Sequence, residues 1–486
     1  MTTFNRLSLQ AAVLFLVIVH PVPSAAHNKT KNSTESHPIP PPTVKTQGGC
    51  DYAKAFRMVF AFGDSDTDPG NALLTGSLTI KINPRVHKSE NPFSDGKLLI
   101  DYVCETLGIP PVPAYQNSSA DFSHGANFAL AGTSCLTNIQ RMHSRIHALL
   151  GKVIPGAINL QLSWFKKYLQ VMAASSGNQA QGGGSLGGSG SGNAHGTMGL
   201  DVADGDGGGI GEISGNSGVA SSSGTWGNGG HRGSGSSSSF SSDSQSGGVS
   251  GGGSISGSGS STSRTGGSAV SKALKDVLFW VGPIGGNDYA RLYSSENPSV
   301  SSQWISQQTI NQVTKLVTTL LETGAKYIVV QGLPPVGCLP ATLSSTPSSD
   351  RDEHGCSTSA NAAVSSHNEE IQQFLALLQK TFVDCTIVFA DFYKAYMTVI
   401  KSPELYHIID AFSTCCGLKG GAVNFNPEHP CGAATTTACQ KAAGHVIWDG
   451  IHLTAQMNKY VAEMFLNQTG YTQPCLMDVA RKKLSS

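Results

Sequence analysis

The chain has 486 residues, of which 32 are basic and 32 are acidic, so its formal net charge is zero. A balanced chain without a basic stripe or an acidic tail gives no sign of a nucleic-acid partner. When a leader and a long Gly/Ser-rich tract are set aside, roughly 370 residues remain, enough for one large domain with a substantial core.

The first 26 residues have the pattern of a secretory signal peptide. Arg6 precedes an apolar stretch over residues 11–19, and residues 24–26 (Ser-Ala-Ala) offer small side chains for cleavage. This stretch is too short to span a membrane, and no later stretch approaches the length required. We therefore expect a secreted, extracellular protein, for example of the cell wall, without a transmembrane segment. Residues 27–54, which contain several prolines, are predicted to be a flexible N-terminal segment.

A buried strand is predicted over residues 58–62, because β-branched and aromatic side chains favour one. It is followed by Gly63, Asp64 and Ser65, and then by residues 66–71, which have turn and helix-start chemistry. Ser65 should therefore lie at the carboxyl end of a strand, where open α/β sheets bind ligands. A serine there is a candidate nucleophile, provided that a base and an oxyanion hole are found elsewhere in the chain.

Two further apolar runs end in glycine-containing turns. Residues 125–132 run into Gly132, and a predicted strand over residues 277–281 runs into a turn that carries Asn287. Ser65, Gly132 and Asn287 would then each follow a different strand at one edge of the sheet. The backbone N–H groups of Ser65 and Gly132 and the side-chain amide of Asn287 are the kind of donors that an oxyanion hole requires. Taken alone, Gly132 or Asn287 would be explained more simply as a turn residue.

A carboxylate and an imidazole stand close together near the C-terminus. Asp449 precedes His452 by three residues, and in a turn or the first coil of a helix such residues share a face. Asp449 can accept a hydrogen bond from Nδ1 of His452, which leaves Nε2 free to take the proton of Ser65. Thr454 is the expected N-cap of a C-terminal helix. On its own, this short motif would more simply be a surface histidine beside a capping aspartate.

The remaining elements complete an α/β pattern. Residues 327–330 and 386–390 are predicted strands, and helices are expected around residues 158–172 and over residues 363–382. Alternating strands and helices predict a three-layer α/β/α sandwich with a mostly parallel sheet of about five strands.

One tract interrupts this pattern. Residues 175–270 are dominated by Gly and Ser, so they cannot bury enough apolar surface to offset the entropy of ordering. We expect a disordered insertion between two parts of a catalytic domain, residues 55–174 and 271–475, and a C-terminal tail over residues 476–486. The tract contains Gly-x-Ser-x-Gly around Ser185 and Ser250, but without the strand–turn–helix context of a nucleophile elbow, so an α/β-hydrolase is disfavoured.

Eleven cysteines and four Asn-x-Ser/Thr sequons fit an oxidising secretory path. Adjacent Cys415 and Cys416 should bond to different partners, and together with Cys431 and Cys439 they could hold the His-bearing loop against the sheet. Their connectivity stays open at this point. The candidate glycosylation sites are Asn28, Asn32, Asn117 and Asn467.

In their order along the chain, these motifs resemble those of the GDSL esterase/lipase family, the SGNH hydrolases, and specifically its large plant branch. The matching segments are Gly63-Asp64-Ser65 with Asp68, Gly70 and Asn71; Asn127-Phe128-Ala129 with Gly132; Gly285-Gly286-Asn287-Asp288; residues 332–338; and Trp448-Asp449-Gly450-Ile451-His452. The resemblance implies a flavodoxin-like fold, Ser65 as nucleophile in a triad with Asp449 and His452, and an oxyanion hole of Ser65, Gly132 and Asn287. It also implies that no cofactor is needed. Asp66 stands where the family has Leu, and Leu453 where Pro is common; neither position is expected to carry the chemistry.

The predicted function is a secreted serine esterase or lipase that hydrolyses a carboxylic ester of a small molecule, a lipid or a polysaccharide. The same machinery could transfer the acyl group to an alcohol acceptor instead of water. A non-catalytic cell-wall interaction protein is a third alternative, which the intact set of five site residues disfavours. No metal site is predicted, because the histidines and cysteines lack metal-ligand spacing. Acyl length and oligomeric state do not follow from the sequence.

Overall fold

The computed structural model describes residues 52–77, 93–136, 154–155, 157–179, 273–295, 300–419 and 423–486. All of them belong to one unit of the chain, formed by residues 1–197 and 263–486. The predicted signal peptide, the sequons at Asn28 and Asn32, and most of the Gly/Ser-rich tract lie outside the described residues.

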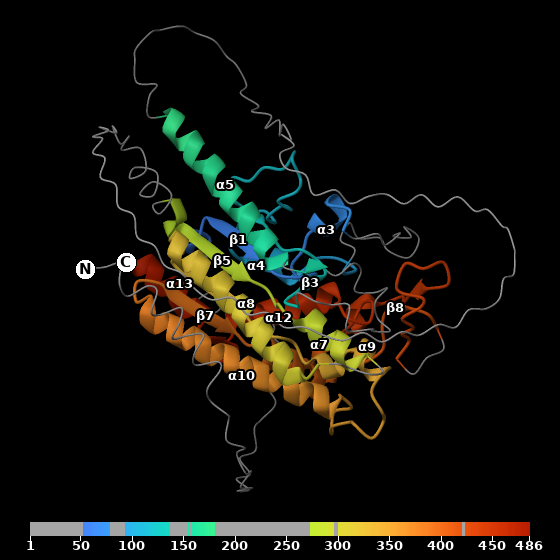
Figure 1. Cartoon of the computed structure of the whole chain (residues 1–486). Helices are drawn as coiled ribbons and strands as arrows, with labels where there is room; N and C mark the ends of the chain where they lie inside the picture. Colours follow the sequence, from blue (N-terminus) through green and yellow to red (C-terminus); the bar gives the residue numbers. More distant parts are fainter. Residues whose placement is uncertain are drawn as a thin grey trace, which may run out of the picture. The chain divides into compact units, whose positions relative to one another are not determined.

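A six-stranded sheet with the order β10-β7-β6-β5-β1-β2 forms the centre of this unit (Figure 1). The five parallel strands are β1 (Met58–Phe62), β2 (Gly125–Asn127), β5 (Val277–Val281), β6 (Tyr327–Gln331) and β7 (Thr386–Ala390). In chain order they follow the 2-1-3-4-5 arrangement of flavodoxin-like folds, which confirms the predicted fold class. The sixth strand, β10 (Thr472–Gln473), pairs antiparallel with β7; its two residues are too few to give a sequence pattern.

Both faces of the sheet are buried, which explains why the sequences of its strands are continuous apolar runs. Successive side chains of a strand point to opposite faces. In β1, Val59 and Ala61 therefore join one hydrophobic core and Phe60 and Phe62 the other. β5 divides in the same way, with Trp280 in the first core and its neighbours in the second.

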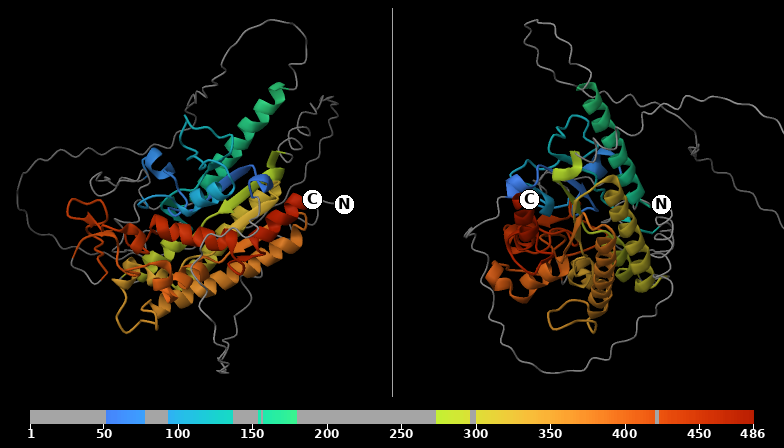
Figure 2. Two further views of the ribbon diagram at one scale, coloured as in Figure 1. Left: turned by 180° about the vertical axis from the view of Figure 1, so that it is seen from behind. Right: turned by 90° about the vertical axis from the view of Figure 1, so that its left-hand side faces the viewer.

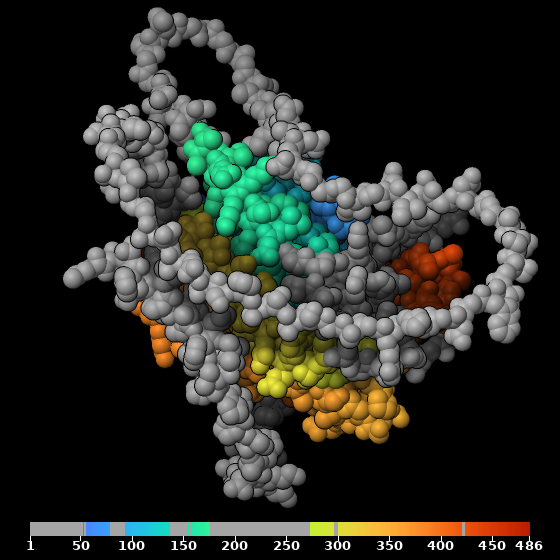
Figure 3. Space-filling model, viewed as in Figure 1, coloured from blue at the N-terminus to red at the C-terminus, as the bar shows by residue number. Residues whose placement is uncertain are grey.

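Helices cover each face. α5 (Ala157–Gln179), α8 (Ser302–Thr323) and α10 (Thr358–Thr381) contribute to the core that holds Phe60 and Phe62. They lie next to one another in Figure 1, and parts of their outer surfaces are among the teal, yellow and orange areas of Figure 3. The opposite core is covered by α4 (Leu99–Thr106), α11 (Phe392–Lys401), α12 (Ala455–Asn467) and α13 (Leu476–Ser485), on the side seen from behind in Figure 2.

Shorter elements connect these layers. They are α2 (Tyr52–Ala55), α3 (Asn71–Leu74), β3 (Thr133–Ser134), β4 (Ile154–Pro155), α7 (Gly286–Tyr293), α9 (Pro340–Leu343), β8 (Cys416–Gly417), β9 (Thr437–Ala438) and four single 3₁₀ turns at Leu274–Asp276, Val336–Cys338, Pro403–Tyr406 and Ala442–Gly444. Across the ranges that the structure describes, each helix is too short or too polar to cross a bilayer.

The structure differs from the predicted segment boundaries at three places. The expected C-terminal tail is the helix α13, whose residues Leu476, Val479 and Ala480 are buried because they share one helical face. The expected flexible N-terminal segment ends in α2, where the ring of Tyr52 is buried and its hydroxyl donates to the carbonyl of Leu466. Helix α5 continues to Gln179, five residues into the predicted insertion.

Candidate active site

The chain turns sharply after β1 and presents Ser65 at the carboxyl edge of the sheet. The carbonyl of Asp64 accepts hydrogen bonds from the N–H groups of Thr67 (3.1 Å) and Asp68 (3.0 Å), which closes the turn around Ser65. β2 and β5 lie on either side of β1, so Ser65 is next to the point where the order of strands reverses. Ligands of open α/β sheets bind at this point.

The structure brings Ser65, His452 and Asp449 into one hydrogen-bonded chain. Nε2 of His452 lies 2.8 Å from Oγ of Ser65, and Nδ1 lies 2.7 Å from Oδ2 of Asp449. Oδ1 of Asp449 accepts the backbone N–H groups of Ile451 (3.1 Å) and His452 (3.0 Å). These bonds orient the carboxylate and the ring, and all three side chains are at most 6% exposed.

A tight loop holds Asp449 and His452 in this arrangement. The N–H of Trp448 donates to the carbonyl of His452 (2.7 Å), so the loop closes over the residues between them. Gly450 has φ 109°, a conformation that L side chains rarely adopt, and a Cβ atom there would collide with the ring of Phe425. Thr454 caps α12 by accepting the N–H of Met457, as predicted.

The three predicted oxyanion donors lie on adjoining segments. Gly132 has φ 78° in a turn in which the N–H of Thr133 donates to the carbonyl of Leu130 (3.1 Å). Asn287, in the first turn of α7, donates from Nδ2 to the carbonyl of Thr133 (3.1 Å), and its amide has a second N–H that can serve a ligand. Among the described residues, the N–H groups of Ser65 and Gly132 donate to no protein acceptor.

The buried charges around His452 favour its protonated form. Burial alone would lower the pKa of His452, but the charge of Asp449, its hydrogen bond, and the carboxylates of Asp66 and Asp64 raise this pKa to about 9. Burial acts against ionisation of Asp449 as well, yet His452 and two backbone N–H groups hold the pKa of Asp449 below its ordinary value. Asp449 is therefore an anion at neutral pH.

Comparisons with known proteins show the family of the chain. A family model described as GDSL-like Lipase/Acylhydrolase matches residues 59–172 and 261–465. The chain belongs to this family. A GDSL esterase/lipase of Arabidopsis thaliana is 30% identical over 447 residues, which cover 89% of this chain and 91% of the relative. Acetylajmalan esterase 2 of Rauvolfia serpentina is 23% identical over 433 residues, which cover 85% of this chain and 90% of the relative. The protein is thus a hydrolase of ester bonds, which confirms the predicted enzyme class.

At Asp66 this member of the GDSL family departs from the family pattern, and the structure gives the departure a consequence that sequence analysis did not foresee. The half-buried Asp66 follows Ser65 directly, and its N–H donates to Oδ1 of Asp64 (3.1 Å). Burial raises the pKa of Asp66, while the neighbouring His452 lowers it. Asp66 therefore adds a carboxylate to the surroundings of the imidazole, where Leu would add none.

Asp68 belongs to the sequence motif that resembles the family, but no role was predicted for it. It ties the loop that follows β1 and carries Ser65, here called the serine loop, to the loop that carries Gly132. Its Oδ1 accepts the N–H groups of Gly70 (2.8 Å) and Asn71 (2.5 Å). Its Oδ2 accepts the N–H groups of Ala72 (3.0 Å) and Ala131 (2.8 Å). Asp68 is fully buried, so each of these bonds replaces one to water.

Asn71 and Asn127 connect the same two loops. Nδ2 of Asn71 donates to the carbonyls of Asn127 and Ala129, both at 2.8 Å. Nδ2 of Asn127 donates back to the carbonyl of Thr67 (2.7 Å). A buried side-chain amide of the serine loop thus donates to the Gly132 loop, and a buried amide of the Gly132 loop donates to the serine loop.

A segment that has no predicted role docks on the loop of Asp449 and His452, here called the histidine loop. The ring of Phe93 packs against the ring of His452 with centroids 5.0 Å apart. Oγ of Ser94 donates to the carbonyl of Leu453 (3.1 Å), and Oδ1 of Asp95 accepts the first N–H of α12 (2.7 Å). The segment has neither strand nor helix periodicity, and its partners lie some 360 positions away, so no local pattern indicates this role.

Disulfides link Cys415 to Cys439 and Cys416 to Cys431, which confirms that the adjacent cysteines have different partners. The N–H groups of Cys415 and Cys416 donate to the carbonyls of Ile447 (3.0 Å) and Trp448 (2.6 Å), directly before Asp449. The cross-linked segment therefore supports the histidine loop. A third disulfide joins Cys338 to Cys356.

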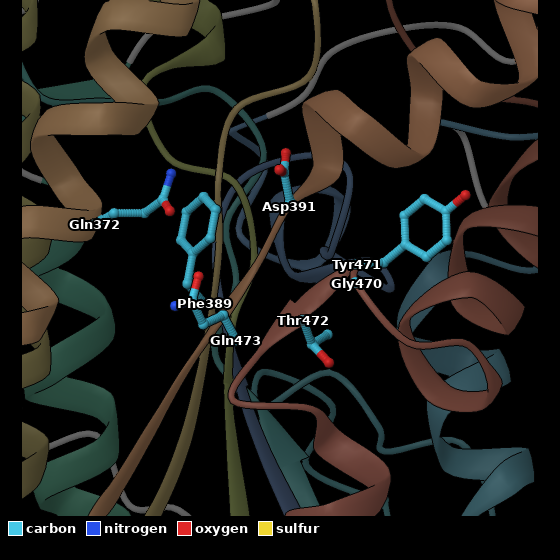
Figure 4. Close-up of a pocket in the computed structure, with 7 residues that line it drawn as sticks. All are labelled: Gln372, Phe389, Asp391, Gly470, Tyr471, Thr472 and Gln473. Atoms are coloured by element: carbon cyan, nitrogen blue, oxygen red, sulfur yellow. The ribbon is translucent and has the colours of Figure 1, made fainter. Parts of the chain in front are cut away.

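A cavity of about 230 Å³ lies at the other edge of the sheet, between α10, β7 and β10 (Figure 4). Asp391 directly follows β7 and is one of the residues that line this cavity. Its Oδ1 caps α11 by accepting the N–H of Lys394 (2.9 Å). Within the described ranges, no group of three histidine, cysteine or acidic side chains here or elsewhere is arranged to hold a metal ion.

Proposed function

We propose that this protein is a secreted serine esterase that hydrolyses carboxylic esters through an acyl-enzyme on Ser65. The observation that carries the proposal is the 2.8 Å contact between Oγ of Ser65 and Nε2 of His452, with Asp449 bonded to the opposite ring nitrogen. Nucleophilic catalysis requires this order of nucleophile, base and orienting group.

In the acylation step, Nε2 of His452 takes the proton of Ser65 while Oγ attacks the ester carbonyl carbon. The carbonyl oxygen becomes an oxyanion, which accepts hydrogen bonds from the N–H groups of Ser65 and Gly132 and from the amide of Asn287. Collapse of this intermediate breaks the bond to the alcohol, which leaves with the proton from His452. Asp449 stabilises the imidazolium that exists between these two transfers.

In the deacylation step, His452 takes a proton from water, and the resulting nucleophile attacks the acyl-enzyme. The second intermediate collapses to a carboxylic acid as the bond to Oγ breaks, and His452 returns the proton to Oγ, which restores free Ser65. An alcohol in place of water would give a new ester, so analysis of products with and without an added alcohol distinguishes hydrolysis from acyl transfer.

Secretion and glycosylation belong to the same proposal. Three disulfides within the described part of the chain suit an oxidising compartment. Asn117 is exposed, and its Oδ1 accepts the hydroxyl of Ser119 (2.8 Å) in a surface turn, while Asn467 is exposed at the end of α12. Both are therefore accessible acceptors for a glycan.

Labelling with a fluorophosphonate, which reacts with activated serines, tests the proposal. We expect the probe to modify Ser65, and Ser65→Ala to abolish both labelling and hydrolysis of a butyryl ester. The matched control is the double variant Ser185→Ala/Ser250→Ala, which removes both Gly-x-Ser-x-Gly serines of the tract and should keep full activity. Labelling that persists in Ser65→Ala and disappears in the double variant would overturn the assignment.

A further inference from the structure

The side chain of Gln161 is a buried amide whose partners all lie beside the proposed active site. Gln161 is in the first turns of α5 and is 0% exposed. Its Oε1 accepts the N–H of Gly63 (3.0 Å), and its Nε2 donates to the carbonyl of the same Gly63 (2.8 Å). Nε2 also donates to Oγ1 of Thr133 (3.0 Å). One amide thus contacts both backbone groups of one residue and the side chain of another.

These two partners flank the groups that would carry out the reaction. Gly63 is two residues before Ser65, and it has φ 148°, a conformation that L side chains rarely adopt. Thr133 directly follows Gly132, and its hydroxyl donates to the carbonyl of Leu130 (2.5 Å) within the same turn. Gln161 therefore bridges the start of the serine loop and the turn that presents the N–H of Gly132. It does so beside a direct bond in which the N–H of Leu130 donates to the carbonyl of Gly63 (3.1 Å).

Packing of α5 on the sheet does not require this amide. The buried face of the helix also carries Ile158, Leu162 and Phe165, and the ring of Phe165 packs against Phe60 and Phe62 with centroids 5.6 Å apart in both pairs. These apolar contacts dock the helix without help. Burying an amide is costly unless its donors and acceptor are paired, so a polar residue on this face needs a different explanation.

We propose that Gln161 is a positioning residue, which holds Ser65 and the Gly132 N–H at the separation that oxyanion stabilisation requires. The inference rests on the proposed acyl-enzyme function. Oxyanion donors act at 2.7–3.1 Å from the developing charge, and a displacement of about 1 Å can cost on the order of 100-fold in rate. Gln161 touches no reacting atom and acts only through Gly63 and Thr133.

Gln161→Met, which keeps the length of the side chain and removes its hydrogen bonds, tests this role. We expect kcat for a butyryl ester to fall about 10- to 100-fold with KM within about threefold, because the lost interaction matters most in the transition state. The affinity for a boronic acid inhibitor, which forms a tetrahedral adduct with Ser65, should fall by a similar factor. The matched control is Gln170→Met, on the exposed face of the same helix, which should change neither quantity. A folded Gln161→Met protein with the kcat of the Gln170→Met control would overturn the inference.

Gln161→Glu adds a readout that a purely structural role would not move, and it decides the question if Gln161→Met fails to fold. When the introduced carboxyl group is ionised, it has no donor for Gly63 and Thr133, whereas its protonated form can donate again. Burial raises the pKa of a carboxyl group, so the rate of Gln161→Glu relative to wild type should increase several-fold from pH 9 to pH 6. A ratio that is constant over this range would overturn the inference. Retained activity of Ser65→Ala would instead show that the proposed function itself is wrong.

Discussion

The two halves of the proposed active site are held in different ways. Ser65 and the Gly132 turn are fixed by hydrogen bonds from buried polar side chains, above all Asp68, which accepts four backbone N–H groups. The loop of Asp449 and His452 is supported by a segment with two disulfides, whose cysteines donate to the backbone directly before Asp449. Buried hydrogen bonds thus fix the serine half, whereas in the histidine half covalent cross-links in the adjoining segment add to the hydrogen bonds of the loop.

The difference follows from where each half lies in the chain. The serine loop leaves β1, an interior strand that is paired on both sides, so its neighbours are rigid and a few well-placed acceptors are enough to fix it. The histidine loop follows residues 402–448, which contain only short strands and 3₁₀ turns in the described ranges and contribute few residues to the main cores. Cross-links constrain such a segment where a hydrophobic core does not. The two halves should therefore respond to different perturbations.

Asp68→Asn should have the largest effect on kcat of the variants that separate the halves. An amide in place of the carboxylate directs N–H groups at backbone donors that need an acceptor, so the serine loop and the Gly132 turn should move apart. We expect kcat to fall about 100-fold and the free energy of unfolding to fall by about 1–3 kcal/mol for the unsatisfied donors, measured by ester hydrolysis and urea denaturation. The control is Asp391→Asn at the far edge of the sheet, which keeps a capping side chain and should leave kcat unchanged. An Asp68→Asn protein with wild-type kcat would show that these bonds do not position the nucleophile.

Removal of the Cys415–Cys439 disulfide by a double change to Ala should act on the histidine half, with a smaller effect on kcat. The chain-entropy model gives a loss of about 3 kcal/mol for loops of this size. We expect kcat to fall about tenfold as well, because the cross-linked segment supports the backbone before Asp449. Removal of Cys338–Cys356, which closes a loop of similar length, should cost similar stability, since both sequence separations are near 20, but leave kcat within about threefold. Equal loss of kcat in both double variants would mean that the cross-links act only through global stability.

Much of the fold and the short site motifs could be predicted from the sequence, and the reason is local. The strands β1, β5, β6 and β7 are buried on both faces, so each is a continuous apolar run. Ser65, Gly132, Asn287, Asp449 and His452 each belong to a short motif at a strand end or before a helix, and the structure brings them together.

The supporting contacts could not be predicted in the same way, because they join residues that are distant in the chain. The docking of Phe93 on His452 has no local pattern. Gln161 did leave a signal, since it is a polar residue three positions after Ile158 on the buried face of an amphipathic helix, but that signal does not name its partners. The pairing of Cys415 with Cys439 depended on tertiary structure that sequence spacing does not specify.

The smallest of the expected effects concerns Asp66, through which the serine half acts on the histidine half by charge alone. An unperturbed histidine would give a rise of kcat/KM near pH ~6.5. Because neighbouring carboxylates raise the pKa of His452 to about 9, and only neutral His452 can take the proton of Ser65, we expect kcat/KM to rise with pH between 7 and 9. Asp66→Leu, the residue usual in the family, removes one of these carboxylates and should shift the midpoint to lower pH by a fraction of a unit, which raises kcat/KM at pH 7 about two- to threefold.

Asp66→Asn separates charge from shape in this last comparison. It removes the negative charge without making the side chain apolar, so it should shift the midpoint by the same amount as Asp66→Leu. The other charged groups that act on His452, Asp449 and Asp64, are unchanged in both variants. A midpoint that stays in place in both variants, or that moves to higher pH, would show that Asp66 does not act on His452 through its charge. A shift in Asp66→Leu alone would assign the effect to the apolar side chain.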